Sequence, residues 1–136
     1  MFDKPFQLQI VTPARVAYKD TAVSISAPGV RGGFQVLYNH APFLSALEIG
    51  ELKVMKKDGS EIRFATGGGF LEVKDNAVVV LADSVENASD IDVERARDAK
   101  ERAAGRMQSK DASVDVERAR LAMLRALNRL KIAGRS

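Results

Sequence analysis

The chain contains the segment DIDVERARDAKERAAGR at residues 90–106 and a near copy, SVDVERARLAMLRALNR, at residues 113–129. Both segments include the hexapeptide DVERAR. In each, small or apolar residues recur every three or four positions, which is the spacing of an α-helix with one apolar face. The repeat therefore predicts two similar helices. The turn-forming residues 108–111 between them predict an antiparallel hairpin.

The predicted helices have narrow, alanine-rich apolar stripes. These are Ala96, Ala99, Ala103 and Met107 in the first helix, and Val116, Ala119, Met123, Ala126, Leu127 and Leu130 in the second. We expect Asp90 and Ser113 as N-caps and Gly134 as the end of the second helix. Alanine permits close packing but buries little area, so the hairpin is predicted to be marginally stable and movable.

Arginine follows the same spacing in both copies. Arg95, Arg102 and Arg106 fall within about 40° of one another on a helix, as do Arg118, Arg125 and Arg129. A turn near residue 110 would place Arg95 level with Arg125, and Arg102 level with Arg118. Arg129 would then lie beside Ile91 and Asp92.

The two arginine rows differ in the acidic residues that could neutralise them. Asp98 can pair with the first row, whereas no acid follows Glu117 in the second helix. This excess predicts an external anion, such as a nucleotide phosphate, an acidic loop of a partner protein or nucleic acid. The alternative is a solvated helix surface held by internal ion pairs.

The first 86 residues have a different pattern. Apolar and polar residues alternate with period two in short runs separated by turn signals, which predicts a β-sandwich or flattened barrel. Residues 57–60 (KDGS) and 75–76 (DN) are predicted hairpin turns. Residues 77–81 (AVVVL) are predicted to form a strand buried on both faces. The sequence thus predicts a β domain at 1–86 and a helical hairpin at 87–136.

Composition limits the classes of protein to consider. Residues 1–86 carry 9 Lys+Arg against 10 Asp+Glu, whereas residues 87–136 carry 12 against 8, so the basic character belongs to the repeat. No apolar stretch is long enough to cross a bilayer, and we expect no signal peptide. The chain has no cysteine, which excludes disulfides and thiolate chemistry and is compatible with the cytoplasm.

Other motifs favour structural roles. Gly67-Gly68-Gly69 is not followed by Lys-Ser/Thr or a helical pattern, so a strand bulge or close packing is a better interpretation than a phosphate loop. His40 is the only histidine, and a corner of the fold or a partner surface suits it better than catalysis. The loop at 28–33 is either a plain turn or a contact surface. We expect no metal site and identify no nucleophile–base pair.

An ordered set of motifs carries a family resemblance. These are Val11-Thr12-Pro13, Pro28-Gly29, residues 36–42 (VLYNHAP), residues 68–73 (GGFLEV), residues 80–83 (VLAD) and residues 91–96 (IDVERA). Together they resemble the epsilon subunit of F-type ATP synthases over essentially the whole chain.

The resemblance implies a sandwich of about ten strands followed by a two-helix hairpin. It implies a non-catalytic rotor subunit of the central stalk that binds the gamma subunit and the c-ring and couples rotation. The hairpin would regulate ATP hydrolysis, either folded or extended toward acidic loops of the beta subunits in the catalytic head. The expected location is the cytoplasmic face of the bacterial inner membrane, as a peripheral protein held by the complex.

The resemblance also implies a regulatory nucleotide site without any required cofactor. In some members the folded hairpin binds ATP through a motif that matches Ile91, Asp92, Arg95 and Ala96, with further arginines that match Arg102, Arg125 and Arg129. Candidate partner contacts are Arg31, Gly33, His40, Arg118 and Arg120.

Two departures from the family pattern affect the partner surface. Gly33 stands where an acid is usual, which removes a charge contact to the c-ring, and Tyr38 replaces a usual proline. The alternative function is a basic helical-hairpin module that binds nucleic acid. Its affinity would fall steeply with salt, whereas a nucleotide site would distinguish ATP from ADP.

Overall fold

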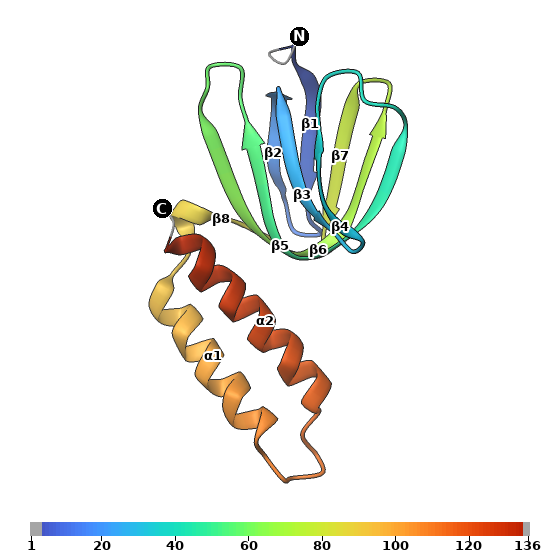
Figure 1. Ribbon diagram of the computed structural model, residues 1–136. Coiled ribbons are helices and arrows are strands. Elements are labelled where there is room, and N and C mark those ends of the chain that lie inside the picture. The colour runs from blue at the N-terminus through green and yellow to red at the C-terminus, as the bar shows by residue number, and fades with distance from the viewer. Residues whose placement is uncertain (1–3, 135–136) are drawn as a thin grey trace. The chain divides into compact units, whose positions relative to one another are not determined.

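The computed structural model describes residues 4–134. The chain divides into two compact units, with the boundary between Asn87 and Ala88. Within residues 4–134, the first unit contains strands as its only regular structure, and the second contains a 3₁₀ turn and two α-helices (Figure 1). Each unit has the local structure that its sequence period favours, two for the strands and about 3.6 for the helices.

The β unit contains eight strands: β1 (Phe6–Val11), β2 (Val16–Ala22), β3 (Ser24–Gly29), β4 (Gly32–Val36), β5 (Phe43–Met55), β6 (Glu61–Lys74), β7 (Ala77–Ala82) and β8 (Val85–Asn87). Their order is β2-β1-β7-β6-β5-β3-β4, and β8 pairs with β6. All neighbours are antiparallel except β1 and β7, which are parallel.

Strands β5 and β6 are long enough to serve both layers of a sandwich. The C-terminal half of β6 pairs with β7, whereas its N-terminal half pairs with β8. Each layer therefore has five strand segments, and the ten segments agree with the number that the resemblance implies.

The core lies between the two layers. One layer contributes Leu8, Ile10, Leu71, Val78 and Val80, and the other contributes Ile25, Val36, Leu52, Val54 and Phe64, all of them buried. Alternation along β1, β3 and β7 directs every second side chain into this core. The prediction that residues 77–81 are buried on both faces is wrong, because Leu81 is 57% exposed.

Both predicted hairpin turns are present. Gly59 has φ 88° between β5 and β6, and Asp75 and Asn76 have φ 53° and 58° between β6 and β7. Asn76 also holds neighbouring segments, because its side chain accepts a hydrogen bond from the Asn39 N–H (2.7 Å) and donates one to the Pro5 carbonyl (3.2 Å).

The helical unit consists of η1 (Ala88–Asp90), α1 (Val93–Met107) and α2 (Val116–Ala133). The N-caps are Asp92 and Asp115, not Asp90 and Ser113. Each cap carboxylate accepts a hydrogen bond from the backbone N–H three residues later, in Arg95 and Arg118. The caps sit two residues later than predicted because this aspartate begins both copies of DVERAR. Gly134 is the C-cap of α2, as predicted.

Candidate functional site

The arginines of the hairpin are positioned by buried alanines. Ala96 and Ala103 of α1 and Ala119 and Ala126 of α2 are buried at seven-residue spacing, so they form the seam between the helices. An arginine stands directly before each of these alanines: Arg95, Arg102, Arg118 and Arg125. One residue is 100° of helical rotation, so each of these arginines lies on the same flank of its seam.

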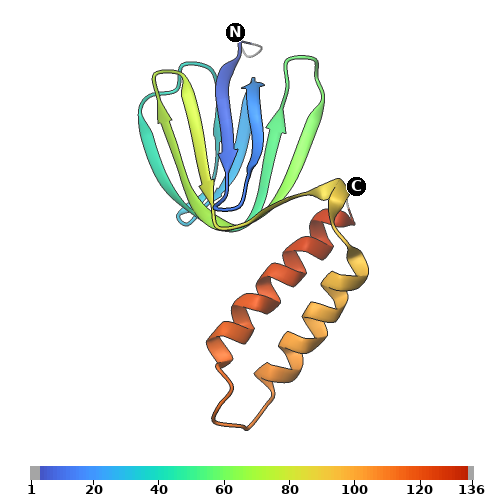
Figure 2. The ribbon, with the colours of Figure 1, turned by 180° about the vertical axis from the view of Figure 1, so that it is seen from behind.

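The two arginine rows share one face of the hairpin. Figures 1 and 2 show the helices side by side and antiparallel, joined by the loop at residues 108–115. In each helix the arginine directly precedes the seam alanine, so the rotation between them has the same sense about that helix's own axis. Because the two helices face each other and run in opposite directions, this rotation carries both rows to the same side of the seam. Arg106 and Arg129, each three residues after a seam alanine, belong to this arginine face.

Internal acids leave most of the arginine face without ion pairs. Glu94 pairs with Arg97 at 3.0 Å and Glu117 pairs with Arg120 at 2.6 Å, both in (i, i+3) arrangement. These pairs lie off the arginine face. Among residues 4–134, the side chains of Arg95, Arg102, Arg106, Arg118 and Arg125 form no ion pair.

The ion pairs of the hairpin differ from expectation at Asp98 and separate Arg120 from Arg118. Asp98 pairs with neither Arg95 nor Arg102 within the described part of the chain. Arg120 lies about 200° from Arg118 around α2. It is paired with Glu117, whereas Arg118 forms no ion pair with residues 4–134. Hydrogen bonding and attraction from Arg120 lower the pKa of Glu117, and the same interactions raise the pKa of Arg120.

The predicted nucleotide residues have different surroundings. Asp92 is the α1 cap, and the Ile91 N–H donates to the Ala88 carbonyl at 3.4 Å. Ala96 is 2% exposed, so its role is to set the spacing of the seam. The other predicted residues, Arg95, Arg102, Arg125 and Arg129, lie on the arginine face and are exposed or half-buried.

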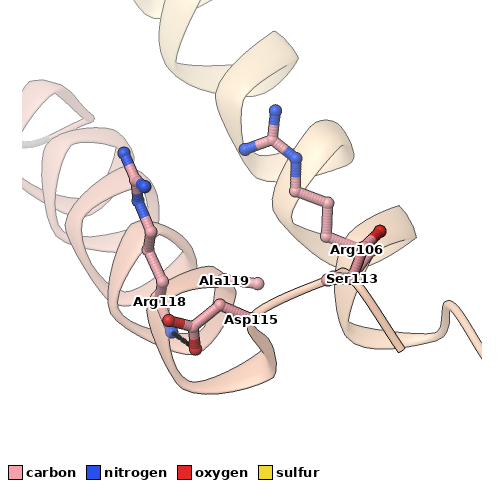
Figure 3. A pocket seen from close by; sticks show the side chains of 6 residues that line it. Arg106, Ser113, Asp115, Arg118 and Ala119 are labelled. Carbon is pink, nitrogen blue, oxygen red and sulfur yellow. Dashed lines mark hydrogen bonds between the residues drawn. The ribbon is translucent and has the colours of Figure 1, made fainter. Parts of the chain in front are cut away.

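A hollow of about 350 Å³ lies at the loop end of the hairpin (Figure 3). Its lining residues are Arg106, Ser113, Val114, Asp115, Arg118 and Ala119. Arg118 was predicted to lie level with Arg102, but it shares this hollow with Arg106. Arg106 was absent from the predicted site residues, although its spacing from Arg95 and Arg102 placed it on the same face.

The predicted partner residues of the β unit come from two loops. Arg31 is exposed in the turn between β3 and β4, and Gly33 is exposed in β4. His40 precedes β5, where its ring lies 5.6 Å from that of Phe43. Its Nδ1 lies 2.7 Å from the Ala41 carbonyl oxygen, and a carbonyl only accepts, so Nδ1 carries the proton.

A second surface was missed by the sequence analysis. Five residues on the outer side of one layer lie in register on neighbouring strands: Ala46, Phe70, Leu81, Val11 and Val16. We call this set the outer row. Phe70, Leu81 and Val16 are each more than half exposed, which is unusual for large apolar side chains grouped together. The signal was Leu81, which extends the apolar run of β7 beyond strict alternation.

Two family models match this chain, one for each unit. Residues 5–88 match the family described as ATP synthase, Delta/Epsilon chain, beta-sandwich domain. Residues 89–134 match the family described as ATP synthase, Delta/Epsilon chain, long alpha-helix domain. The chain belongs to the delta/epsilon chain family of ATP synthases.

Individual members of the delta/epsilon family agree over the full length. The chain is 47% identical to the ATP synthase epsilon chain of Pelotomaculum thermopropionicum, covering 99% of this chain and 100% of that one. It is 45% identical to the epsilon chain of Desulforamulus reducens, covering 96% and 98%. A chain in the structure of the Euglena gracilis mitochondrial ATP synthase has the same fold, with a TM-score of 0.82, 22% identity, and coverage of 97% and 82%.

Within residues 4–134, His, Asp and Glu side chains nowhere gather in a group of three suited to a metal ion. Neither α1 nor α2, the helices of the described region, combines the length and the apolar character needed to span a membrane.

Proposed function

We propose that this delta/epsilon family chain is the non-catalytic epsilon subunit of the central stalk of an F-type ATP synthase. In this role the β unit binds the gamma subunit and the c-ring and couples their rotation. The observation that carries the proposal is the outer row, because an exposed apolar row across five strands suits a permanent protein interface. The complex would hold the chain at the cytoplasmic face of the bacterial inner membrane.

The direct test is co-purification with alpha, beta and gamma subunits from a co-expressing strain. We expect a stable complex, and we expect Phe70→Ala/Leu81→Ala to weaken binding to gamma by about tenfold or more. Leu124→Ala is the control, because Leu124 is also exposed and apolar but belongs to α2. Circular dichroism of each variant confirms that the fold is retained. A stable assembly that lacks all three subunits would refute the assignment.

For the hairpin we propose regulation of ATP hydrolysis, with ATP as the ligand of its folded form. The proposal rests on the guanidinium groups of Arg95, Arg102 and Arg125, which form no ion pair with residues 4–134 and lie on the arginine face that begins at the Ile91–Asp92 end of α1. Guanidinium groups bind phosphate through paired charge-assisted hydrogen bonds. When the hairpin extends, the same arginines would face acidic loops of the beta subunits.

Isothermal titration of the full chain with ATP tests this ligand. We expect Arg95→Ala/Arg125→Ala to weaken binding by about tenfold or more, because each lost charge-assisted hydrogen bond is costly. Arg97→Ala/Arg120→Ala is the matched control, since it removes the same charge from the ion-paired arginines off the arginine face. The absence of heat at millimolar ATP would leave the arginines as protein contacts.

The nucleic-acid alternative has less support. Residues 89–134 contain no aromatic side chain on which a base could stack. The titration separates the two functions, because nucleic-acid binding would fall steeply with salt and would not distinguish ATP from ADP.

A further inference from the structure

The loop-end hollow brings one arginine from each helix to the same space. Arg106 belongs to the last turn of α1 and Arg118 to the first turn of α2. Figure 3 shows both side chains extending the same way from adjacent helices, and both line the hollow. Arg95 is eleven residues before Arg106, or about 16 Å along the helix, so the Ile91–Asp92 end of the hairpin is remote from this hollow.

The charge inside the hollow is not balanced. Arg106 and Arg118 contribute two positive charges, and neither forms an ion pair with residues 4–134. Among the described residues, Asp115 is the only acid that lines the hollow, and its carboxylate already accepts a hydrogen bond from the Arg118 backbone N–H at 3.0 Å as the helix cap. Asp111 is engaged with Ser113, whose backbone N–H and hydroxyl both donate to it at 2.9 Å.

The position of Arg118 adds to this imbalance. A cation in the first turn of a helix faces the positive end of the helix dipole, where an acid is preferred. The acid of that turn, Glu117, pairs with Arg120 instead. Arg118 is therefore held in an unfavourable place without a counter-ion among residues 4–134, and an anion between Arg118 and Arg106 would relieve the repulsion.

We infer that the hollow binds a small phosphate-bearing anion, held by Arg106 from α1 and by Arg118 from α2. Two guanidinium forks can engage different oxygens of one phosphate group. The volume of about 350 Å³ is at the small end of ligand sites, which suits phosphate or pyrophosphate better than a peptide segment. A bound anion would tie the end of α1 to the start of α2 and close the hairpin at its loop.

The test is a titration of the full chain with inorganic pyrophosphate, followed by calorimetry and by the amide NMR signals of residues 106–119. We expect saturable binding, with the largest shifts at Arg106 and at Asp115–Arg118. Arg106→Ala/Arg118→Ala should weaken binding by about tenfold or more. Arg97→Ala/Arg120→Ala, with the same change of net charge, should alter it by less than about twofold, since exposed charges at a distance are screened.

Several results would overturn the inference. One is the absence of pyrophosphate binding at millimolar concentration, and another is equal weakening in the control variant. Loss of binding in Arg95→Ala/Arg125→Ala but not in Arg106→Ala/Arg118→Ala would assign the anion to the proposed ATP site and leave that proposal standing. Binding of polyglutamate without binding of pyrophosphate would assign the hollow to an acidic partner.

A second variant keeps the test valid if the alanine pair loses helix content. Arg106→Lys/Arg118→Lys retains both charges and removes the planar forks. It should bind pyrophosphate more weakly than the wild-type chain while its circular dichroism is unchanged. Equal binding by the lysine variant would show that charge alone attracts the anion and would contradict a built site.

Discussion

At the scale of single residues, the two DVERAR copies use their side chains in the same way. The aspartate caps the helix, the glutamate pairs with the last arginine, and the alanine is buried in the seam. The first arginine, Arg95 or Arg118, has no ion-pair partner in the described part of the chain. The repeat thus builds one unpaired cation per copy next to a fixed backbone position.

The Glu117–Arg120 pair predicts a pH dependence of α2. The pKa of Glu117 is lowered from 4.5 by hydrogen bonding and attraction from Arg120. Since the folded-state pKa is the lower one, the stabilisation is fully present above about pH 4.5 and is lost as the pH falls through the folded-state pKa. Glu117→Gln should therefore lower helix content at pH 7, and its difference from the wild-type chain should shrink toward pH 3.

Helix content at 222 nm between pH 7 and pH 3 measures this effect. Glu101→Gln is the matched control, because Glu101 is an exposed acid of α1 that forms no ion pair with residues 4–134. A loss of helix in the control as large as that in Glu117→Gln would contradict the assignment to the Arg120 pair.

At the scale of elements, β6 depends on three consecutive glycines. They lie where β6 changes its neighbour from β8 to β7, and Gly68 and Gly69 have φ of 105° and 141°. A Cβ at Gly69 would overlap the carbonyl oxygen of Leu81 in the adjacent strand. The glycines therefore allow one strand to bend from one layer into the other, and the close approach to Leu81 bears out close packing, one of the two alternatives that the sequence predicted at this site.

Gly69→Ala is expected to destabilise the β unit by about 2 kcal/mol or more, because both the backbone angle and the close approach exclude a side chain. Gly33→Ala is the matched control. Gly33 also lies in a strand, but its φ is not positive, and an added Cβ would meet only the Ala27 carbonyl oxygen at 3.7 Å. Urea unfolding followed by circular dichroism compares them. Equal destabilisation of the two variants would contradict the proposed role of Gly69.

Some of these elements can be predicted from the sequence alone, and others cannot. Turn residues such as Gly59 and Asp75-Asn76 have strong local preferences, so the hairpins they form were predictable. The bend at Gly67–Gly69 joins segments that look like separate strands, because its effect depends on contacts with Leu81 and Ser84. Likewise, the outer row forms only when the register aligns Phe70 with Leu81, and no local pattern reveals that alignment.

In the hairpin, too, local features of the candidate site can be predicted from the sequence, whereas contacts between the two helices cannot. Seven-residue spacing predicted the arginine face, because helical geometry is local. The pairing of Arg118 with Arg106 depends on where the loop ends and α2 begins, at the Asp115 cap. The sequence predicts that cap at Ser113, two residues too early, so the level of the two helices at the loop end does not follow from the sequence alone.

At the scale of the whole molecule, the two units have unequal cores. The core of the β unit is formed entirely by residues between Phe6 and Val85 and includes many large side chains. In α1 and α2 the buried residues are Ala96, Ala103, Ala119, Ala126 and Ile132, four of them alanines. Since hydrophobic stabilisation grows with buried apolar area, the β unit should be much the more stable one.

This difference predicts two separate unfolding transitions. On heating the full chain, we expect ellipticity at 222 nm to fall first, while the NMR signals of core residues such as Leu71 and Val80 persist.

Substitutions in the two cores should act independently, because each unit has its own core. Leu71→Ala should lower only the second midpoint, at a cost of about 2 to 5 kcal/mol, since Leu71 is fully buried. Arg106→Ala/Arg118→Ala should leave the second midpoint unchanged, and pyrophosphate should raise only the first, because a ligand stabilises the unit that binds it. A single cooperative transition, shifted as a whole by Leu71→Ala, would show that the hairpin does not unfold separately from the β unit.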